Sequence, residues 1–362
     1  MPPGPSGVRP ECVVIKIGTS SLISAQRPDP AKLDALADAM VRLRADGLRP
    51  VLVASGAIAL GSSRLGLTGP QSDSTCQLAA AVGQGLLFDA FRCAFEERGL
   101  LAAQILLTPP DLIGPEHQGG TRAVLEGALN ADLVPVVNEN DAVMVRNNDV
   151  LAALVAALLG AGRLVLLTDV PGLYESDPRQ DATARRIPEV RAMTPAVERL
   201  AGVTTQGLGT GGMAAKLCAV WIATTAGVAA VIAGADTEDG AVRAVRGDDI
   251  GTLVHPRRPA KQPDVGLLWR ALSAPPSGRL VCRPEALAVM ADGGPLLGRH
   301  IQSCTGSFAS GTVVDLVAPG LRPDGAEVVA RGRVSAGSAA LATAGEELTV
   351  LHHTAYISFL EV

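Results

Sequence analysis

The sequence predicts an α/β fold: a three-layer αβα domain with a mainly parallel sheet, followed by a small, mainly β, barrel-like domain. Two observations predict it. Short runs of Val, Ile and Leu recur over the first 260 residues, and segments with helical spacing separate them. Apolar runs that do not alternate with polar residues are typical of strands covered on both faces. Strands that alternate with helices indicate a parallel sheet.

The elements follow from these patterns in chain order. The expected strands of the first domain are 12–17, 51–54, 105–108, 134–138, 164–168 and 228–233. The expected helices between them are 31–45, 78–97, 150–159 and 213–226. Prolines then punctuate the chain, and short strand-like runs follow at 279–282, 312–318, 327–334 and 354–360. We therefore expect domains at 1–262 and 278–362, joined by a linker at 263–277.

Composition narrows the class of protein. The net charge of -5 offers no attraction for nucleic acid or for an anionic membrane surface. The six cysteines are far apart and form no C-x-x-C pair, so neither a zinc site nor a disulfide framework is expected. The first residues lack the apolar core of a signal peptide, and no run reaches the ~18–20 apolar residues of a membrane span. These features favour a cytoplasmic protein without a membrane partner.

Polar residues follow the predicted strands at their carboxyl ends. Lys16 ends the first strand, Ser55 follows the second, Asp141 lies just beyond the fourth, and Thr168-Asp169 ends the fifth. Ligands of open α/β sheets bind outside the carboxyl ends of the strands. These side chains therefore mark one edge of the sheet as the candidate site.

The segment GLGTGGMAAK, residues 207–216, has the character of a phosphate-binding loop. Its glycines allow the backbone to approach an anion closely, and a helix beginning at Met213 adds a positive dipole end. Taken alone, such a segment is equally compatible with a plain flexible loop. The chain has only four lysines, however, and two of them, Lys16 and Lys216, lie beside Gly-rich turns. A compact ammonium group is therefore expected to matter at both positions.

Two ammonium groups at one site suit phosphoryl transfer, which depends mainly on positioning and charge stabilisation. A carboxylate, Asp149 or Asp169, would orient a lysine or help to hold Mg²⁺. If the nucleophile is already an ionised carboxylate, no general base is needed. No Ser/His/Asp arrangement is present to supply one, since all five histidines lie outside the strand-end motifs.

Together these motifs resemble the amino acid kinase family. The resemblance is carried, in order, by VVIKIGTSSL, VASGAIALG, AAVGQ, VPVVNENDAV, NNDVLAALVAALLGA, LLTDVPGLYESDPR and GLGTGGMAAK. NEND with GTGGM-x-x-K is typical of the branch that phosphorylates the γ-carboxylate of glutamate, the first step of proline biosynthesis. IQSCTGSFASGTVVDL, residues 301–316, resembles a PUA-type domain, so the resemblance implies an amino-acid-kinase-like domain with a PUA-like barrel.

The resemblance also implies roles for individual residues. Asp149 would organise the two catalytic lysines, Lys16 and Lys216. Glutamate would contact Ser55, Asp141 and Asn148. ATP, the co-substrate with Mg²⁺, would contact Lys16, Thr168, Asp169, Thr210, Gly211, Gly212, Met213, Ala214, Ala215 and Lys216. No protein ligand for the metal is assigned. The implied partners are further copies of the chain, as a dimer or tetramer, and a glutamyl phosphate reductase.

The sequence departs from the family pattern at four places. The loop before Asp149 is short, residues 120–125 lack the family's Asn and Asp, Cys76 replaces a lysine, and Ala215 replaces a threonine. One alternative is therefore a sister kinase for another acidic amino acid. A second is an RNA-binding or regulatory protein acting through the C-terminal domain, against which the acidic balance of residues 278–362 argues. A third is a kinase-like protein without turnover, against which the presence of both lysines and Asp149 argues.

Overall fold

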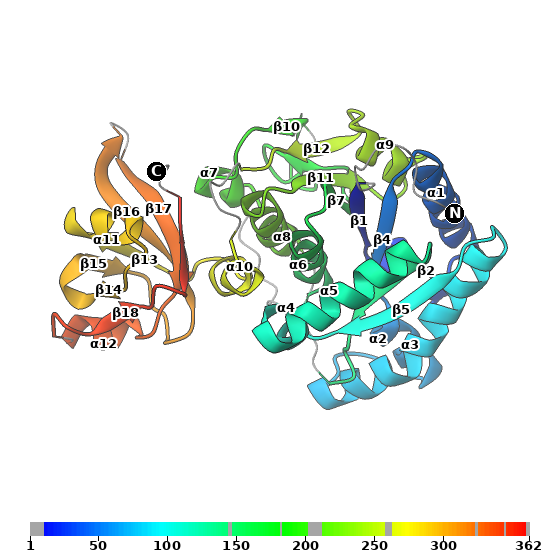
Figure 1. Cartoon of the computed structure of the whole chain (residues 1–362), viewed down its shortest axis with the longest axis horizontal. Coiled ribbons are helices and arrows are strands. Elements are labelled where there is room, and N and C mark those ends of the chain that lie inside the picture. The colour runs from blue at the N-terminus through cyan, green and yellow to red at the C-terminus, as the bar shows by residue number, and fades with distance from the viewer. Residues whose placement is uncertain are drawn as a thin grey trace. The chain divides into compact units, whose positions relative to one another are not determined.

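The chain divides into two compact units, Met1–Ala260 and Lys261–Val362. The structure is a computed structural model that describes residues 11–143, 147–181, 183–201, 212–257, 263–322, 325–343 and 345–359. The first unit is an α/β domain built around one large sheet, and the second is mainly β (Figure 1).

The central sheet has eight strands in the order β10-β12-β11-β7-β1-β4-β6-β5. Their bounds are β1 Cys12–Ile17, β4 Arg49–Ala54, β5 Ala102–Leu107, β6 Val134–Glu139, β7 Arg163–Thr168, β10 Glu189–Val190, β11 Ala229–Gly234 and β12 Gly251–Val254. The pairs from β11 through β5 are all parallel, whereas β12 runs antiparallel to β11. The prediction of a mainly parallel α/β sheet is confirmed.

Helices cover both faces of this sheet (Figure 1). On one face lie α1 (Pro30–Ala45), α2 (Ala57–Arg64), α3 (Asp73–Glu96) and α9 (Gly240–Arg246). On the other lie α4 (Pro109–Ile113), α5 (Pro115–Asn130), α6 (Asn148–Leu159) and α8 (Met213–Thr225). The helix α7 (Pro195–Arg199) and the hairpins β2–β3 (Ile23–Ser24, Arg27–Pro28) and β8–β9 (Leu173–Tyr174, Arg186–Ile187) lie in the connections.

Alternation along β1 decides which side chains meet which helices. Successive side chains of a strand point to opposite faces of the sheet. Val13, Ile15 and Ile17 join the buried cluster that includes residues of α1 and α9. Lys16 therefore points to the opposite face, where α6 contacts β1 and packs against α8. Lys16, a charged residue within a buried strand, thus points toward α6 and α8, which come much later in the sequence.

Several helices were not expected from the sequence. α2, α5 and α9 fall in segments for which no helix is predicted. α5 contains three glycines and few apolar residues, so it lacks the periodic apolar stripe that indicates a helix. The proline at its start and the burial of Leu125 and Leu129 stabilise this helix despite its weak local propensity. All six predicted strands of the first domain, by contrast, are present within a few residues of their expected limits.

The second unit holds a five-stranded sheet in the order β15-β13-β16-β17-β19 and a two-stranded sheet, β14-β18. The strands are β13 Arg279–Cys282, β14 Leu296–Leu297, β15 Ile301–Thr305, β16 Val313–Arg322, β17 Gly325–Arg333, β18 Thr349–Leu351 and β19 Tyr356–Ser358. Its helices are α10 Val265–Leu272, α11 Glu285–Ala291 and α12 Ser338–Thr343. α10 lies inside the stretch predicted as a linker and contacts β17 and β19, so that stretch contains an ordered part of the second unit.

A buried ion pair crosses the larger sheet of the second unit. Asp315 on β16 and Arg331 on β17 are direct partners in the strand register, and Nε of Arg331 lies 2.7 Å from Oδ1 of Asp315. Both side chains are almost fully buried. Because a buried charge without its partner is strongly destabilising, this pair specifies the register of the two strands.

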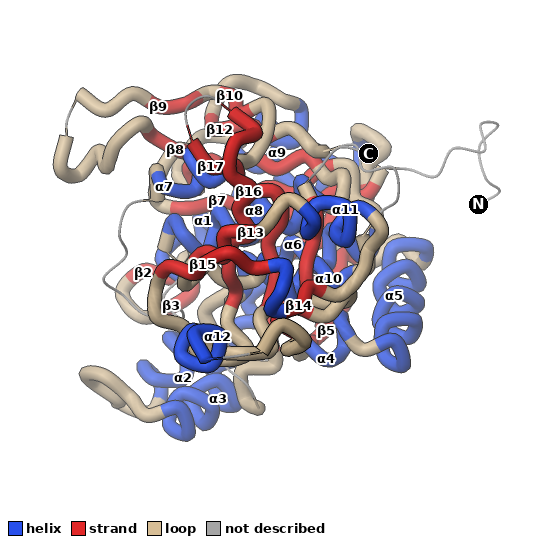
Figure 2. The backbone as a smooth tube through the Cα atoms, turned by 90° about the vertical axis from the view of Figure 1, so that its left-hand side faces the viewer, coloured by secondary structure: helices blue, strands red, loops and turns tan. Residues whose placement is uncertain are grey.

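The helices α2 and α3 make an unusually close pair, and they lie side by side in both views (Figure 1, Figure 2). A Cβ atom added at Gly83 would lie 1.9 Å from the carbonyl oxygen of Ala57, and one at Gly61 would lie 1.8 Å from that of Ala79. The two backbones can approach this closely only because both positions are glycine.

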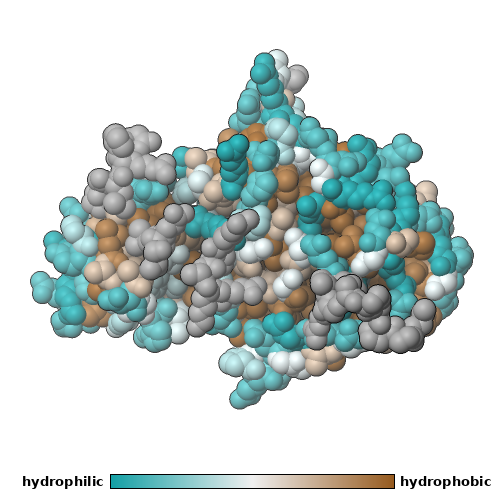
Figure 3. All heavy atoms as spheres, turned by 45° about the horizontal axis from the view of Figure 1, so that its top comes forward, coloured by the Kyte–Doolittle hydropathy of each residue, from teal (hydrophilic) through white to brown (hydrophobic). Residues whose placement is uncertain are grey.

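Among the described helices, α3 is long and apolar enough, by length and composition alone, to cross a membrane. Core helices of soluble proteins pass the same test, and Leu87, Phe91 and Phe95 of α3 belong to the buried core of the domain. Figure 3 shows the surface of one side of the molecule, where hydrophilic residues cover the projecting parts and hydrophobic residues lie in the recesses between them.

The glycines of α3 provide a test of this packing. We expect Gly83→Ala to destabilise the protein by about 1–3 kcal/mol, because the new methyl group would overlap the backbone of α2. Gly85→Ala, on the same helix with no atom within 4 Å of the new Cβ, should instead stabilise it by roughly 0.5–1 kcal/mol. Urea denaturation midpoints measure both changes. Equal effects of the two substitutions would contradict the packing described here.

Candidate active site

The carboxyl ends of the parallel strands bring the predicted site residues to one edge of the sheet. Lys16 lies at the end of β1, Ser55 follows β4, and Thr168 ends β7. Lys16 is paired in register with Val53 of β4 and Leu166 of β7, so the ends of these three strands are neighbours. Lys16, Ser55 and Thr168 therefore lie at or just beyond the carboxyl ends of three neighbouring strands.

Asp149 connects the two lysines that the sequence singled out. Nζ of Lys16 lies 2.7 Å from Oδ1 of Asp149, and Nζ of Lys216 lies 3.2 Å from Oδ2 of the same carboxylate. The three residues come from β1, α6 and α8. Each oxygen of one carboxylate therefore holds one ammonium group, which places both groups at a single site.

These three groups are removed from water. The exposed fractions are 5% for Lys16, 1% for Asp149 and 6% for Lys216. Burial lowers the pKa of Lys16, and the nearby charge of Lys216 lowers it further, while the Asp149 carboxylate acts in the opposite direction. Burial alone would raise the pKa of Asp149, but the two ammonium groups outweigh burial and hold it below its usual value. Asp149 is thus ionised at neutral pH and carries the negative charge of the cluster.

The start of α6 explains how Asp149 is held. Asn147 is the N-cap residue, and its Oδ1 accepts a hydrogen bond from the backbone N–H of Asp149 at 2.8 Å. An acidic residue in the first turn is also favoured by the positive end of the helix dipole. Beyond this turn the helix is almost wholly apolar and buried, and it ends at Gly160 in the left-handed conformation. The carboxylate therefore projects from the fixed end of a core helix.

The three residues assigned to glutamate lie around the ends of β4 and β6. Ser55 is half-buried after β4, and Asn148 is the first residue of α6. Oδ1 of Asn148 accepts a hydrogen bond from the backbone N–H of Glu139 at 3.2 Å, which ties α6 to the end of β6. Asp141 is 9% exposed, and burial raises the pKa of its carboxyl group to about 6. A buried carboxylate of this kind is well suited to receive a substrate ammonium group.

The residues assigned to ATP divide into two groups. Thr168 is buried at the end of β7, and its hydroxyl donates to Oδ1 of the exposed Asp169 at 2.9 Å. Gly212 is the N-cap of α8, and Met213, Ala214 and Ala215 form the half-buried first turn that precedes Lys216. Thr210 and Gly211 lie outside the described residues. The described part of this group therefore presents the N-terminus of α8 beside the two lysines.

The structure adds Glu139, to which the sequence assigned no role although it belongs to the NEND motif. It is the last residue of β6, and its side chain is 4% exposed. Its Oε1 accepts a hydrogen bond from the backbone N–H of Asn147 at 3.0 Å. Its neighbour Asn138 donates from Nδ2 to Oε1 of Gln84 on α3 at 2.8 Å. Two adjacent side chains at the end of β6 thus anchor two different helices.

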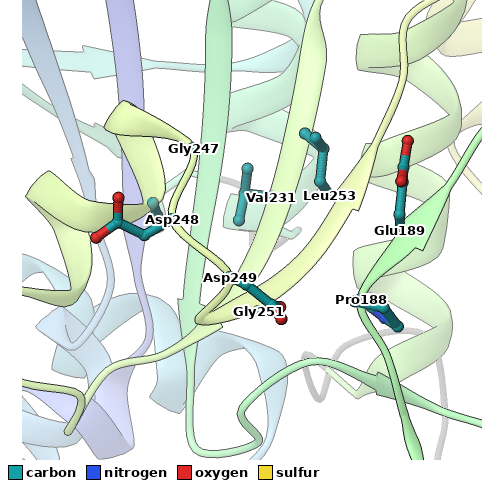
Figure 4. Close-up of a pocket in the computed structure, with 9 residues that line it drawn as sticks. Pro188, Glu189, Val231, Gly247, Asp248, Asp249, Gly251 and Leu253 are labelled. Atoms are coloured by element: carbon teal, nitrogen blue, oxygen red, sulfur yellow. The ribbon is translucent and has the colours of Figure 1, made fainter.

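A cavity of about 270 Å³ lies elsewhere, beside the strands at the β10 edge of the sheet. Figure 4 shows Asp248 and Glu189 on opposite sides of it, with Val231 and Leu253 between them. None of the residues predicted to bind substrate or nucleotide lines it. Its carboxylates already have partners, as in the ion pair of Asp248 with Arg243 and the contact of Glu189 with His255. The convergence of charges at Asp149, rather than this cavity, identifies the candidate active site.

The described residues form no dedicated cage for a metal ion. Within the described ranges, no group of three or more His, Cys, Asp or Glu side chains is placed to hold a metal ion. Mg²⁺ in phosphoryl-transfer enzymes is commonly held by one or two carboxylates together with the phosphates of the substrate. Asp169, exposed beside Thr168, is a carboxylate that fits such an arrangement.

Comparison with known proteins supports the same interpretation. Residues 11–234 match the model of the amino acid kinase family, which is more than half of the chain. A glutamate 5-kinase from Frankia casuarinae is 41% identical over 341 residues, which cover 91% of this chain and 88% of that protein. A glutamate 5-kinase from Salinispora arenicola is 40% identical and covers 84% of each chain. Glutamate 5-kinase 2 from Bacillus subtilis is 36% identical over 315 residues, again covering 84% of each chain.

The fold is also shared with a solved structure. Carbamate kinase from Giardia lamblia bound to AMP-PNP superposes with a TM-score of 0.52 at 16% identity, covering 68% of this chain and 99% of that one. At this identity the likeness concerns the fold alone. The match to the family model and the curated relatives carry the assignment further: this chain belongs to the amino acid kinase family and is a kinase.

Proposed function

We propose that the protein transfers the γ-phosphoryl group of ATP to the γ-carboxylate of glutamate, giving glutamyl 5-phosphate and ADP in the first step of proline biosynthesis. The observation that carries this proposal is the bridge from Asp149 to Lys16 and Lys216. Relatives about 40% identical over most of the chain are named glutamate 5-kinase, which supports glutamate as the acceptor.

The reaction needs no protein base. The γ-carboxyl group of glutamate, with an ordinary pKa of ~4.3, is already ionised at neutral pH. One of its oxygens attacks the γ-phosphorus, the bond between that phosphorus and the β–γ bridging oxygen breaks, and ADP leaves with the electron pair. Both reactants are anions, so the enzyme's task is to bring them together and to stabilise the charge that develops.

The two lysines perform that task in this proposal. Lys16 and Lys216 donate toward the oxygens of the transferred group from two sides, in a site where water is largely excluded. Asp149 keeps them in place in the absence of substrate, because two unpaired ammonium groups at such close range would repel each other. The N-terminus of α8 adds the positive end of a helix dipole for the phosphates.

Asp141 and Asp169 serve the two substrates separately. Asp141 pairs with the α-ammonium group of glutamate, with Ser55 and Asn148 beside it. Asp169 would hold Mg²⁺ together with the phosphates of ATP, and the ion would supply positive charge to neutralise the phosphates. We also place the reaction in the cytoplasm.

Three further assignments rest on the family resemblance. We propose that the second unit is a PUA-type domain, in keeping with its small β sheets. We propose that the chain forms a dimer or tetramer, in keeping with large apolar side chains exposed on α3, β5 and α5, including Leu78, Leu106 and Val124. A glutamyl phosphate reductase is the proposed consumer of the labile product.

A panel of acceptors tests the choice of substrate. ADP release should be much faster with glutamate than with aspartate or N-acetylglutamate, and hydroxylamine should trap the acyl phosphate as a hydroxamate. The shortened loop before Asp149 and the altered residues 120–125 favour another acidic amino acid as the second candidate. Glutamate turnover no better than that of the other acceptors would rule out the proposed substrate.

The lysines provide a second prediction. Lys216→Ala should lower kcat by about 10³-fold or more, because a group that stabilises only the transition state is lost. Lys216→Arg should also fail, since a planar guanidinium cannot replace a compact ammonium held 3.2 Å from Asp149. Lys32→Ala is the matched control: Lys32 is partly exposed and paired with Asp236, so its loss should leave kcat unchanged. Near-normal turnover in either Lys216 variant would refute the assigned role.

The pH dependence of glutamate binding provides a third prediction. Burial raises the pKa of Asp141 to about 6, so this carboxyl group loses its charge as the pH falls through 6. kcat/KM for glutamate should therefore drop about tenfold between pH 7 and pH 5. Asp141→Asn should remove this acidic limb and raise KM for glutamate by about 10- to 100-fold, the effect of losing one charged hydrogen bond. An unchanged acidic limb in the variant would assign it to another group.

A further inference from the structure

Glu139 is a buried charged residue to which the proposed mechanism gives no part. Its position is unusual for a glutamate, a residue type that is almost never fully buried unless it is paired. It ends β6 with its side chain 4% exposed, and its Oε1 accepts a hydrogen bond from the backbone N–H of Asn147 at 3.0 Å. This contact joins the carboxyl end of a central strand to the residue that caps α6.

Two further hydrogen bonds connect this contact to the first turn of α6, which carries Asp149. Asn147 accepts from the backbone N–H of Asp149 through its own Oδ1 at 2.8 Å. The backbone N–H of Glu139 also donates to Oδ1 of Asn148 at 3.2 Å. The side chain and the backbone of Glu139 thus bind consecutive residues at the start of α6, and the next residue is Asp149.

We propose that Glu139 is a positioning residue: its carboxylate holds the N-cap of α6 against the end of β6 and so fixes Asp149 between the two lysines. A helix terminus has unsatisfied backbone groups and frays unless it is capped. Here the cap residue itself is anchored from the sheet, which limits movement of the first turn. Displacement of a reacting group by about 1 Å can cost about 100-fold in rate, so such an anchor has a kinetic effect.

The charge of Glu139 has a second, separable consequence. Among the described residues, the charged groups that act on Lys16 are Asp149 on α6, Lys216 on α8 and Glu139 on β6. Glu139 acts to raise the pKa of Lys16, against the effect of burial. Within the part of the chain that the structure describes, Glu139 thus adds a second carboxylate near the two ammonium groups, and a neutral residue at position 139 would withdraw its support for the charged form of Lys16.

Two substitutions separate the hydrogen bond from the charge. Glu139→Asp keeps the charge but withdraws the acceptor by one methylene, and it should lower kcat by about 10- to 100-fold. Glu139→Gln keeps an acceptor oxygen at the same reach and should retain most of kcat. Its pH profile should change instead: with one negative charge lost, the pKa of Lys16 falls and the basic limb moves to lower pH. The basic limb of the Asp variant should stay in place.

A double-mutant cycle shows whether the effect passes through the helix cap. Asn147→Ala removes the acceptor for the Asp149 N–H and should itself lower kcat. If Glu139 acts through Asn147, adding Glu139→Asp should cost much less than it does alone. Melting temperatures of all variants distinguish a rate effect from loss of the fold. Wild-type kcat in Glu139→Asp, a Gln variant as impaired as the Asp variant, or additive effects in the cycle would each overturn the proposal.

This inference rests on the proposed function, and the assay keeps the two apart. Kinetics are measured with ATP and whichever acidic amino acid the wild-type protein phosphorylates fastest. If that acceptor is not glutamate, the proposed substrate fails, but the ratio of variant to wild-type rates still decides the role of Glu139. If glutamate is the acceptor and the variants match the wild type, only the inference about Glu139 fails.

Discussion

The site depends on one buried carboxylate that holds two ammonium groups against their mutual repulsion. Asp149 lies 2.7 Å from Nζ of Lys16 and 3.2 Å from Nζ of Lys216, and all three side chains are almost completely buried. In such surroundings charges interact much more strongly than in water. Removing the carboxylate would leave the two buried ammonium groups without the partner that both of them contact, which is strongly destabilising. The contacts of Asp149 with Lys16 and Lys216 therefore serve catalysis and also contribute to the stability of the folded domain.

The fold supplies this arrangement from distant parts of the sequence. Alternation along β1 turns Lys16 away from the α1 face and toward α6 and α8, and the start of each of those helices carries one of the other two charges. Because β1 lies in the interior of a parallel sheet, its carboxyl end opens where the neighbouring strands also end. A different strand order, or a shift of α6, would separate the charges of Lys16, Asp149 and Lys216.

Much of the fold of the first domain and several of the site residues could be predicted from the sequence. The buried parallel strands leave long apolar runs, and all six expected in the first domain are present. The scarcity of lysine in a chain rich in arginine distinguishes Lys16 and Lys216 as candidate functional residues. The role of Asp149 came from the family resemblance, because nothing in the local pattern around residue 149 distinguishes it from other acidic helix starts.

What could not be predicted depends on tertiary contacts. α5 has a glycine-rich, weakly apolar sequence, and burial of Leu125 and Leu129 supports it. β12 runs antiparallel to β11, but a four-residue strand has no sequence pattern that indicates its direction. Glu139 belongs to a motif visible in the sequence, but its hydrogen bond to Asn147 spans eight residues and exists only once α6 has docked on β6. Sequence patterns indicate which residues are buried and which periodicity a segment has. They do not indicate which helices and strands contact each other in the folded domain.

The scarcity of lysine also makes the central claim directly measurable. A protein with ¹⁵N-labelled lysine has four side-chain Nζ signals, which Lys→Arg variants assign. Addition of ADP, Mg²⁺, glutamate and aluminium fluoride, a mimic of the transferred phosphoryl group, should shift the signals of Lys16 and Lys216 together and leave that of Lys32 in place. If only one of the two responds, or neither, the two ammonium groups do not converge on the transferred phosphoryl group and the account is wrong.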